Sequence, residues 1–239
     1  MFQRRAPLDH VMSLLDDVRA ILLDIEGTTT PIAFVHDVLF SYAREQVRQF
    51  LNDNSAAEDI ALLREEHAID VKEGRNPPPL TAAYVEWLIA LDRKSTGLKS
   101  LQGKIWRQGY ESGSLKSQVF DDVAPAFQRW HERGLRISIF SSGSVLAQQL
   151  LFAYTEVGDL TRFIDGYFDT RVGKKVEVES YRKIAEAVGL EPEQILFISD
   201  VTGELEAASQ AAMKTIMSIR PGNEPQSQYP SIRSFDEIR

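Results

Sequence analysis

The stretch "ILLDIEGTTTPIAFV" spans Ile21 to Val35 and carries Asp24 and Glu26 directly after an apolar run. Carboxylates gathered at strand ends would repel each other in a partly dry cleft. A hard cation with oxygen ligands relieves such repulsion, and Mg2+ suits this ligand set. A carboxylate beside Mg2+ can attack phosphorus, while a neighbouring acid protonates the leaving oxygen and then activates water. The spacing therefore raises phosphoryl transfer through an aspartyl-phosphate as a hypothesis.

Two later apolar runs also end in polar residues. The run "LRISIFSS" ends in Ser141 and Ser142, and "QILFIS" leads directly into Asp200. Ligands of an open α/β sheet bind outside the carboxyl ends of its strands, so we expect these side chains to share one edge with Asp24. Serine hydroxyls placed there can donate hydrogen bonds to the non-bridging oxygens of a phosphate.

Each of these signals also has an ordinary structural explanation. An Asp after an apolar strand often caps a helix or shapes a turn, and Ser and Gly are common in turns. The stretch "VGKKVEVES" supplies Lys174 and Lys175, which alone would be solvated surface charges, although a lysine reaching the site would neutralise developing charge. The ordered combination at three successive strand ends is what favours a site.

The elements that would position these residues alternate along the second half of the chain. Continuous apolar runs are typical of parallel strands buried on both faces. They cover residues 20–24, 135–142, 194–199, 213–219 and, in a shorter run, 163–170. Amphipathic helical patterns with capping residues separate them at 121–134, 144–155, 179–190 and 203–212. This alternation predicts an α/β fold with a doubly wound, mostly parallel sheet.

The segment after the first strand has a different pattern. Residues 31–117 contain amphipathic helical patterns and no convincing strand, and Pro77–Pro79 interrupt the helical series. We therefore predict a catalytic core of residues 1–30 and 118–239, with residues 31–117 inserted as a helical unit. Residues 11–20 are interpreted as a short amphipathic helix or as part of a mobile N-terminal extension.

Composition excludes several classes of function. The chain has no Cys, which excludes disulfides, thiolate zinc sites and a Cys nucleophile. Its formal net charge is −8 and no basic stripe stands out, so we expect no nucleic-acid partner. No window approaches the ~18 apolar residues of a membrane span, and the N-terminal stretch lacks the apolar region of a signal peptide. We expect a soluble, cytoplasmic protein with no membrane partner.

Five stretches resemble the enolase-phosphatase family of methionine salvage, within the haloacid dehalogenase-like phosphohydrolases. They are "DIEGTTTPIAFVHDVLFSYAREQV", "LDRKSTGLKSLQGKIWR", "FSSGSVLAQQLLF", "GYFDTRVGKKVEVESYRKIA" and "LFISDVTGELEAA...RPGN". The resemblance extends over residues 20–223, and the second stretch is specific because it lies in the insert. It implies a haloacid dehalogenase-like core with an all-helical cap, hinged at residues 28–31 and 111–118.

The resemblance also implies roles for the residues at the strand ends. Asp24 would be the nucleophile and a Mg2+ ligand, Glu26 an acid–base residue with a metal contact, and Asp200 the distal Mg2+ ligand. Ser141 and Ser142 would be the phosphate-binding pair.

Four other residues take their roles from the resemblance. Lys175 aligns with the family's catalytic and phosphate-binding lysine, which leaves Lys174 as a neighbour. Glu204, one helical turn after Asp200, would hold either a metal-bound water or Lys175. His36 stands where relatives often carry Lys, and it is either a surface residue or a substrate contact.

The implied reaction has two steps at one site. The substrate, 2,3-diketo-5-methylthiopentyl-1-phosphate, first loses a proton from the carbon bearing the phosphate ester, and hydrolysis of the phosphate then releases the acireductone. A metal and a lysine that favour phosphate charge also favour a nearby enolate. The enolisation base stays open between Glu26 and a residue of the insert. We expect a monomer acting on this small phosphate ester.

Three alternatives are compatible with parts of the pattern. The nearest is another capped, Mg2+-dependent phosphatase acting on phosphoglycolate or a sugar phosphate. A signalling receiver domain gathers similar residues, but it lacks a helical insert of roughly 85 residues after its first strand. A metal-free dehalogenase is disfavoured by the acid at Glu26 and by the "SD" that ends in Asp200.

Overall fold

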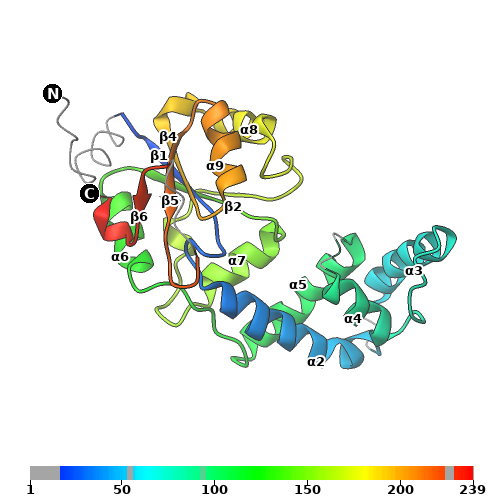
Figure 1. The fold of residues 1–239 in the computed structure, drawn as a ribbon. Helices are drawn as coiled ribbons and strands as arrows, with labels where there is room; N and C mark the ends of the chain where they lie inside the picture. The colour runs from blue at the N-terminus through cyan, green and yellow to red at the C-terminus, as the bar shows by residue number, and fades with distance from the viewer. Residues whose placement is uncertain (1–16, 53–55, 92, 94, 224–228, 239) are drawn as a thin grey trace. The chain divides into compact units, whose positions relative to one another are not determined.

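The computed structural model describes residues 17–52, 56–91, 93, 95–223 and 229–238 (Figure 1). Most of residues 11–20, which the sequence leaves open between a short helix and an N-terminal extension, lie outside the described residues. The chain divides into two compact units, of which unit 1 comprises the described residues up to Ile32 and from Ser117 onward. Unit 2 spans Ala33–Lys116. The sequence places these boundaries at 30/31 and 117/118, and the units divide at 32/33 and 116/117.

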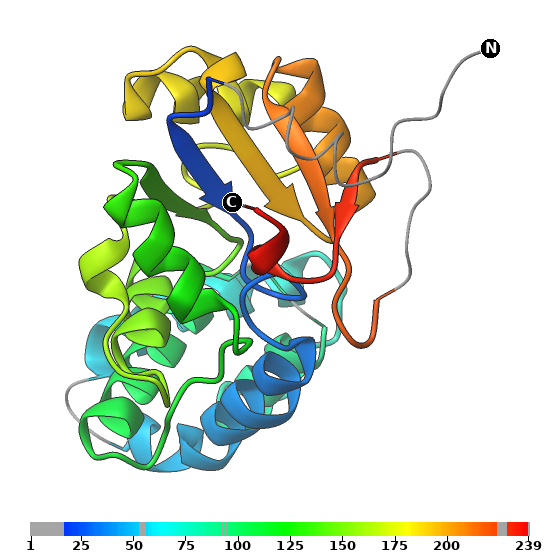
Figure 2. The same cartoon turned by 90° about the vertical axis from the view of Figure 1, so that its left-hand side faces the viewer.

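Unit 1 contains a six-stranded sheet in the order β3-β2-β1-β4-β5-β6. Its strands are β1 (Ala20–Leu23), β2 (Arg136–Phe140), β3 (Gly166–Phe168), β4 (Ile195–Ser199), β5 (Lys214–Ser218) and β6 (Ser231–Ile232). All five pairings are parallel, and the strand arrows of Figure 2 point the same way. The predicted α/β sheet is confirmed. The two-residue strand β6 was not predicted, because so short a strand leaves no apolar pattern.

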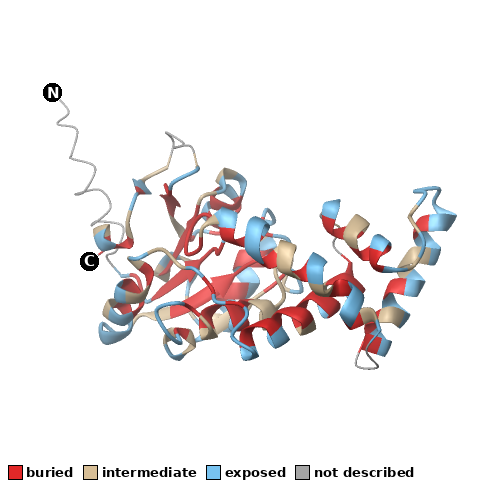
Figure 3. Cartoon of the chain, turned by 90° about the horizontal axis from the view of Figure 1, so that it is seen from below, coloured by how far each residue is buried: buried red, intermediate tan, exposed pale blue. Residues whose placement is uncertain are grey.

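Helices cover both faces of this sheet. They are α6 (Val123–Glu132), α7 (Val145–Ala153), α8 (Val178–Val188) and α9 (Thr202–Gln210), with 3-10 turns η3 (Thr161–Phe163), η4 (Pro192–Gln194) and η5 (Phe235–Glu237). Successive side chains of a strand point to opposite faces. Accordingly, Ile21 and Leu23 pack in the cluster around Trp130, whereas Leu22 packs in the cluster around Tyr181. Both faces of β1 are buried, which explains its unbroken apolar run. Figure 3 shows the strands at the centre of the sheet in the colour of buried residues.

The strand order places a switch point beside β1. The chain builds β2 and β3 on one side of β1 and then returns to build β4 on the other side. Ligands of such sheets bind at the carboxyl ends of the strands where the order reverses. Asp24 follows β1 and Asp200 follows β4, so both carboxylates lie at this point.

Unit 2 is helical throughout its described elements. These are a π-helical segment η1 (Phe34–Leu39) and helices α2 (Phe40–Leu51), α3 (Ala57–Lys72), α4 (Ala82–Ala90) and α5 (Thr96–Glu111). Pro77–Pro79 lie in the irregular segment between α3 and α4, as the sequence predicts. Helix α5 begins at a polar cap, where the Ser95 hydroxyl accepts from the Leu98 N–H at 2.9 Å. In the described part of the chain, no helix has the length and hydropathy needed to cross a bilayer.

A buried carboxylate of α3 contacts helix α4 and two residues outside the helices of unit 2. Asp70 is fully buried and accepts hydrogen bonds from the Tyr84 hydroxyl at 2.7 Å, from Arg75 Nε at 2.6 Å and from Arg93 at 3.0 Å. Burial opposes ionisation, but the Tyr84 and Arg75 hydrogen bonds and the Arg93 charge outweigh it and lower the pKa of Asp70. Asp70 is therefore an ionised, fully compensated structural group.

Candidate active site

The residues that follow β1 are held by β4 and by the Asp24 side chain. The Asp24 N–H donates to the Ile198 carbonyl at 3.0 Å, and the Ile25 N–H donates to Asp24 Oδ1 at 2.7 Å. Gly27 has a φ of 69°, in the left-handed region that favours glycine. A Cβ at Gly27 would lie 2.1 Å from Asp200 Oδ2. Only glycine lets this turn approach the Asp200 carboxylate so closely.

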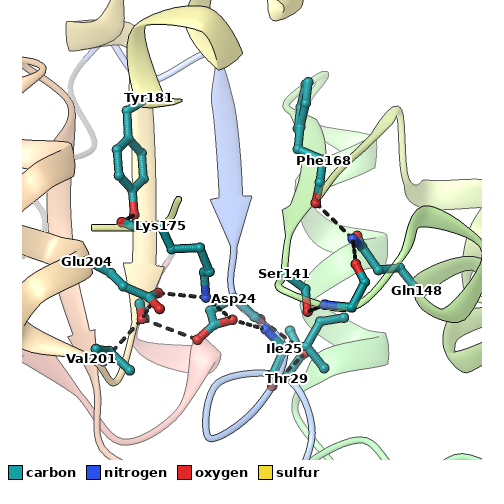
Figure 4. Close-up of polar contacts among 12 residues, drawn as sticks. Asp24, Ile25, Thr29, Ser141, Gln148, Phe168, Lys175, Tyr181, Val201 and Glu204 are labelled. Carbon is teal, nitrogen blue, oxygen red and sulfur yellow. Dashed lines mark hydrogen bonds and ion pairs between the residues drawn. The ribbon is translucent and has the colours of Figure 1, made fainter. Parts of the chain in front are cut away.

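A buried lysine links two acids beside this turn (Figure 4). Lys175 Nζ lies 2.5 Å from Asp24 Oδ1 and 2.7 Å from Glu204 Oε2. The Ser199 hydroxyl lies 2.9 Å from the same Glu204 oxygen and 3.3 Å from Asp24 Oδ2. All four side chains are buried, so these charges interact in a medium of lower dielectric than water. Along the chain, Lys175 lies 151 residues after Asp24 and Ser199 lies 175 residues after it.

Burial and mutual repulsion perturb the ionisation of this cluster. Burial lowers the pKa of Lys175, but the charges of Asp24 and Glu204 raise it by more, so the lysine stays protonated. Burial and the Asp24 charge raise the pKa of Glu204 to about 7, against the opposing effect of Lys175. Burial and the Asp24 charge also raise the pKa of Asp200. Three carboxylates therefore face one cation, which leaves an excess of negative charge.

This charge excess fits a site for a hard cation. Burial and, after it, the charge of Asp24 disfavour the ionised form of Asp200, and a bound divalent cation would favour that form again. The donors are carboxylate oxygens, which Mg2+ and similar ions prefer. Among the described residues, no group of three or more His, Asp or Glu side chains is preassembled for a metal. Glu26 follows in the same turn with an exposed side chain, whereas Asp24 is buried.

The serines after β2 lie in a tightly bonded loop. Ser141 is buried, its N–H donates to the Phe168 carbonyl at 3.1 Å, and its Oγ accepts from the Gly143 N–H at 3.1 Å. Ser142 is exposed. The α7 helix begins three residues later with Ser144 as its cap, at the carboxyl edge of β2.

The structure separates the two neighbouring lysines. Lys174 is exposed, and its ammonium lies 3.3 Å from Glu177 Oε1, whereas Lys175 is buried against Asp24. His36 lies in unit 2, is exposed, and contacts the ring of Phe40 edge-on at 5.5 Å between centroids.

Three supporting residues were not singled out from the sequence. The Tyr181 hydroxyl donates to the Lys175 carbonyl at 2.6 Å, the Ser199 hydroxyl contacts Glu204, and Asn223 Nδ2 lies 3.5 Å from Asp200 Oδ2. Asn223 also donates to the Ser218 carbonyl at 3.0 Å, which fixes its side chain. All three lie inside the family stretches quoted above. They are uncharged, however, and nothing in the local sequence distinguishes them from ordinary surface or core residues.

Comparisons with known proteins agree on the class. Residues 18–212 match the family model described as haloacid dehalogenase-like hydrolase. The chain is 52% identical over 238 residues to an enolase-phosphatase E1 of Synechococcus elongatus, covering 95% of this chain and 100% of that protein. It is 46% identical to a plant protein of Arabidopsis thaliana named a probable bifunctional methylthioribulose-1-phosphate dehydratase/enolase-phosphatase E1, over 92% of this chain and 48% of that one. The UTR4 protein of Saccharomyces cerevisiae superposes with a TM-score of 0.76 at 38% identity, over 92% and 99% of the two chains.

Proposed function

Because the chain belongs to the enolase-phosphatase E1 family of haloacid dehalogenase-like hydrolases, we propose that it enolises 2,3-diketo-5-methylthiopentyl-1-phosphate and then hydrolyses the phosphate ester to give the acireductone. The observation that carries the proposal is the buried contact of Lys175 with Asp24 at the switch point of the sheet. The name of the plant relative, which joins this activity to a methylthioribulose-1-phosphate dehydratase, supports a role in methionine salvage.

Asp24 is proposed as the nucleophile. One of its carboxylate oxygens forms a bond to phosphorus while the bond from phosphorus to the ester oxygen breaks, which gives an aspartyl-phosphate. Lys175 neutralises the charge that develops on the phosphoryl oxygens, and its own charge is secured by Asp24 and Glu204. Ser141 and Ser142 are proposed to donate to the non-bridging oxygens.

Glu26 is proposed as the acid and base of the hydrolysis. As acid, it gives a proton to the leaving ester oxygen; as base, it takes a proton from the water that attacks phosphorus and restores Asp24. Its exposed position leaves it able to exchange protons with solvent. The base that removes the carbon-bound proton in the first step is either Glu26 or a residue of unit 2, which we propose acts as a cap.

The family is metal-dependent, and we propose Mg2+ as the ion, held by Asp24 and Asp200 with a contribution from Glu26. When bound, it would supply positive charge to the phosphoryl oxygens and to the enolate. The charge excess around Asp200 supports this assignment. A monomeric state and a cytoplasmic location remain predictions, which gel filtration and cell fractionation would check.

One assay tests the proposal. The diketo phosphate is supplied with Mg2+, and enol absorbance and free phosphate are followed together. We expect enol absorbance to rise first or together with phosphate release, and turnover on phosphoglycolate and sugar phosphates to be much slower. Faster turnover on those esters, with no enol absorbance from the diketone, would assign the chain to another branch of the phosphatases. A stable phospho-Asp24 without turnover would favour a receiver domain.

A further inference from the structure

We infer that Gln148 is a positioning residue for the phosphate-binding loop of residues 141–144. The inference rests on the proposed function, because it assigns Gln148 to the loop that would hold the phosphoryl group. Gln148 lies on α7, four residues after the helix cap Ser144, and its side chain is buried. Its side chain extends from α7, the helix that follows the loop, back toward the loop (Figure 4).

The side-chain amide of Gln148 spans two segments. Its Nε2 donates to the Gly143 carbonyl at 2.9 Å and to the Phe168 carbonyl at 2.8 Å. An amide nitrogen has two hydrogens, so both donors are used. The Gln148 Oε1 atom has no hydrogen-bond partner in the described part of the chain. The side chain therefore acts through its N–H groups alone.

The Phe168 carbonyl connects the Gln148 side chain to the start of the loop. The same oxygen accepts from the Ser141 N–H at 3.1 Å, so one acceptor at the end of β3 fixes both the start of the loop and the Gln148 amide. Through Gln148, the Gly143 carbonyl is held relative to that acceptor. The Gly143 N–H in turn donates to Ser141 Oγ, which fixes the hydroxyl proposed to meet the phosphate.

This arrangement matters for phosphate binding because donors that are already oriented need no reorganisation when the anion arrives. Without the Gln148 donors, Gly143 loses the partner of its carbonyl, and the loop gains conformations that hold Ser141 in other orientations. The start of α7 keeps two other restraints, since Ser144 Oγ accepts from the Ala147 N–H and Asp169 accepts from the Val145 N–H. The expected defect is therefore local to the loop.

The test compares Gln148→Met with Gln149→Met. Methionine keeps the length and burial of glutamine but has no donor, and Gln149 is the exposed neighbour on the same helix. Three quantities are measured with Mg2+ present: KM and kcat for the diketo phosphate, the inhibition constant of inorganic phosphate, and the midpoint of thermal unfolding.

For Gln148→Met we expect KM and the inhibition constant of phosphate to rise roughly tenfold to a hundredfold, because small misplacements in a site carry such costs. We expect kcat to fall less than KM rises, and Gln149→Met to match the wild type. A purely structural role would lower the unfolding midpoint and the active fraction while leaving KM and phosphate inhibition unchanged, and that result would overturn the inference.

Two further results keep the inference separate from the proposed function. If wild-type protein does not turn over the diketo phosphate, the proposed function fails, and Gln148 is then judged on the affinity for inorganic phosphate alone. If Gln148→Met does not fold, Gln148→Asn is used, whose shorter amide reaches at most one of the two carbonyls. Phosphate affinity equal to that of the wild type in this variant would also overturn the inference.

Discussion

Each unit contains a cluster of charged side chains around a buried carboxylate, and the two clusters have opposite balances of positive and negative charge. In unit 2, the single carboxylate of Asp70 faces two guanidinium groups and a tyrosine hydroxyl, and its pKa is lowered. In unit 1, one ammonium group, that of Lys175, faces a set of carboxylates. There the pKa of Glu204 is raised to about 7, and that of Asp200 is raised as well.

The difference supports the proposal that the Asp24 cluster is functional and the Asp70 cluster is structural. The Asp70 cluster is complete within the folded chain, so its carboxylate stabilises unit 2 and has little need of a ligand. The Asp24 cluster carries uncompensated negative charge that burial makes costly, and a bound divalent cation would offset it. Clusters of perturbed pKa are often functional, although structural ion networks perturb pKa values too. Substitutions in each cluster, paired with exposed controls, test whether the two clusters differ in this way.

The largest effect is expected for Asp24→Asn. Removing the attacking carboxylate should lower kcat for phosphate release by at least about 10⁴-fold, the scale seen for lost nucleophiles. Unfolding stability should be retained, because the change removes one of several mutually repelling charges. Phosphate release is the measurement, and Asp121→Asn, an exposed Asp in the same unit, is the control. Turnover near the wild-type rate would remove Asp24 from its proposed role.

Lys175→Ala should have the next largest effect. Losing a group that neutralises transition-state charge typically costs about 10²–10³ in kcat. Lys174→Ala is the matched control, since Lys174 is exposed and pairs with Glu177 at the surface. Comparing kcat of both variants checks the assignment. A larger loss for Lys174→Ala would mean that the wrong lysine of the pair has been assigned to the site.

Asp200→Asn should act on the metal requirement. With one proposed ligand weakened, the Mg2+ concentration for half-maximal activity should rise at least about tenfold, as weakened metal shells commonly do. Saturating Mg2+ should restore part of the activity, which the Asp24 variant cannot show. An unchanged Mg2+ titration would contradict the ligand role, and Asp121→Asn again serves as the control.

The sequence alone predicts most of the strands of unit 1 and the acids at their ends. It does not predict the Asp70 cluster of unit 2. Strands buried on both faces leave unbroken apolar runs, so β1, β2, β4 and β5 were visible, and their polar ends marked Asp24 and Asp200. The two-residue strand β6 and the six-residue π-helical segment η1 are too short to leave a recognisable hydrophobic pattern. The contacts of Gln148 and Asp70 depend on which segments meet in three dimensions, and a single Gln or Asp in a helical pattern carries no local sign of that.

In unit 2, Asp70→Asn should lower the free energy of unfolding by about 1–2 kcal/mol, because buried donors lose a charged acceptor. The two arginines are about one-third exposed, so water replaces part of their interaction and keeps the loss moderate. Urea unfolding measures the change, with the exposed Asp37→Asn in the same unit as control. Turnover per folded molecule should remain near wild type. A loss of turnover without a loss of stability would remove the contrast between the two clusters.

The smallest effect is the pH dependence of that stability loss. The pKa of Asp70 is lower in the folded chain than in the unfolded chain, where an Asp titrates at about pH 3.9. The unfolded chain therefore binds this proton first, and the stabilisation by ionised Asp70 is present above the unfolded pKa and is lost as pH falls through the folded pKa. The stability difference between wild type and Asp70→Asn should thus be constant near neutral pH and shrink at more acidic pH. Urea titrations at a series of pH values measure it, and a difference that grows on acidification would show that Asp70 is not held ionised by its arginine partners.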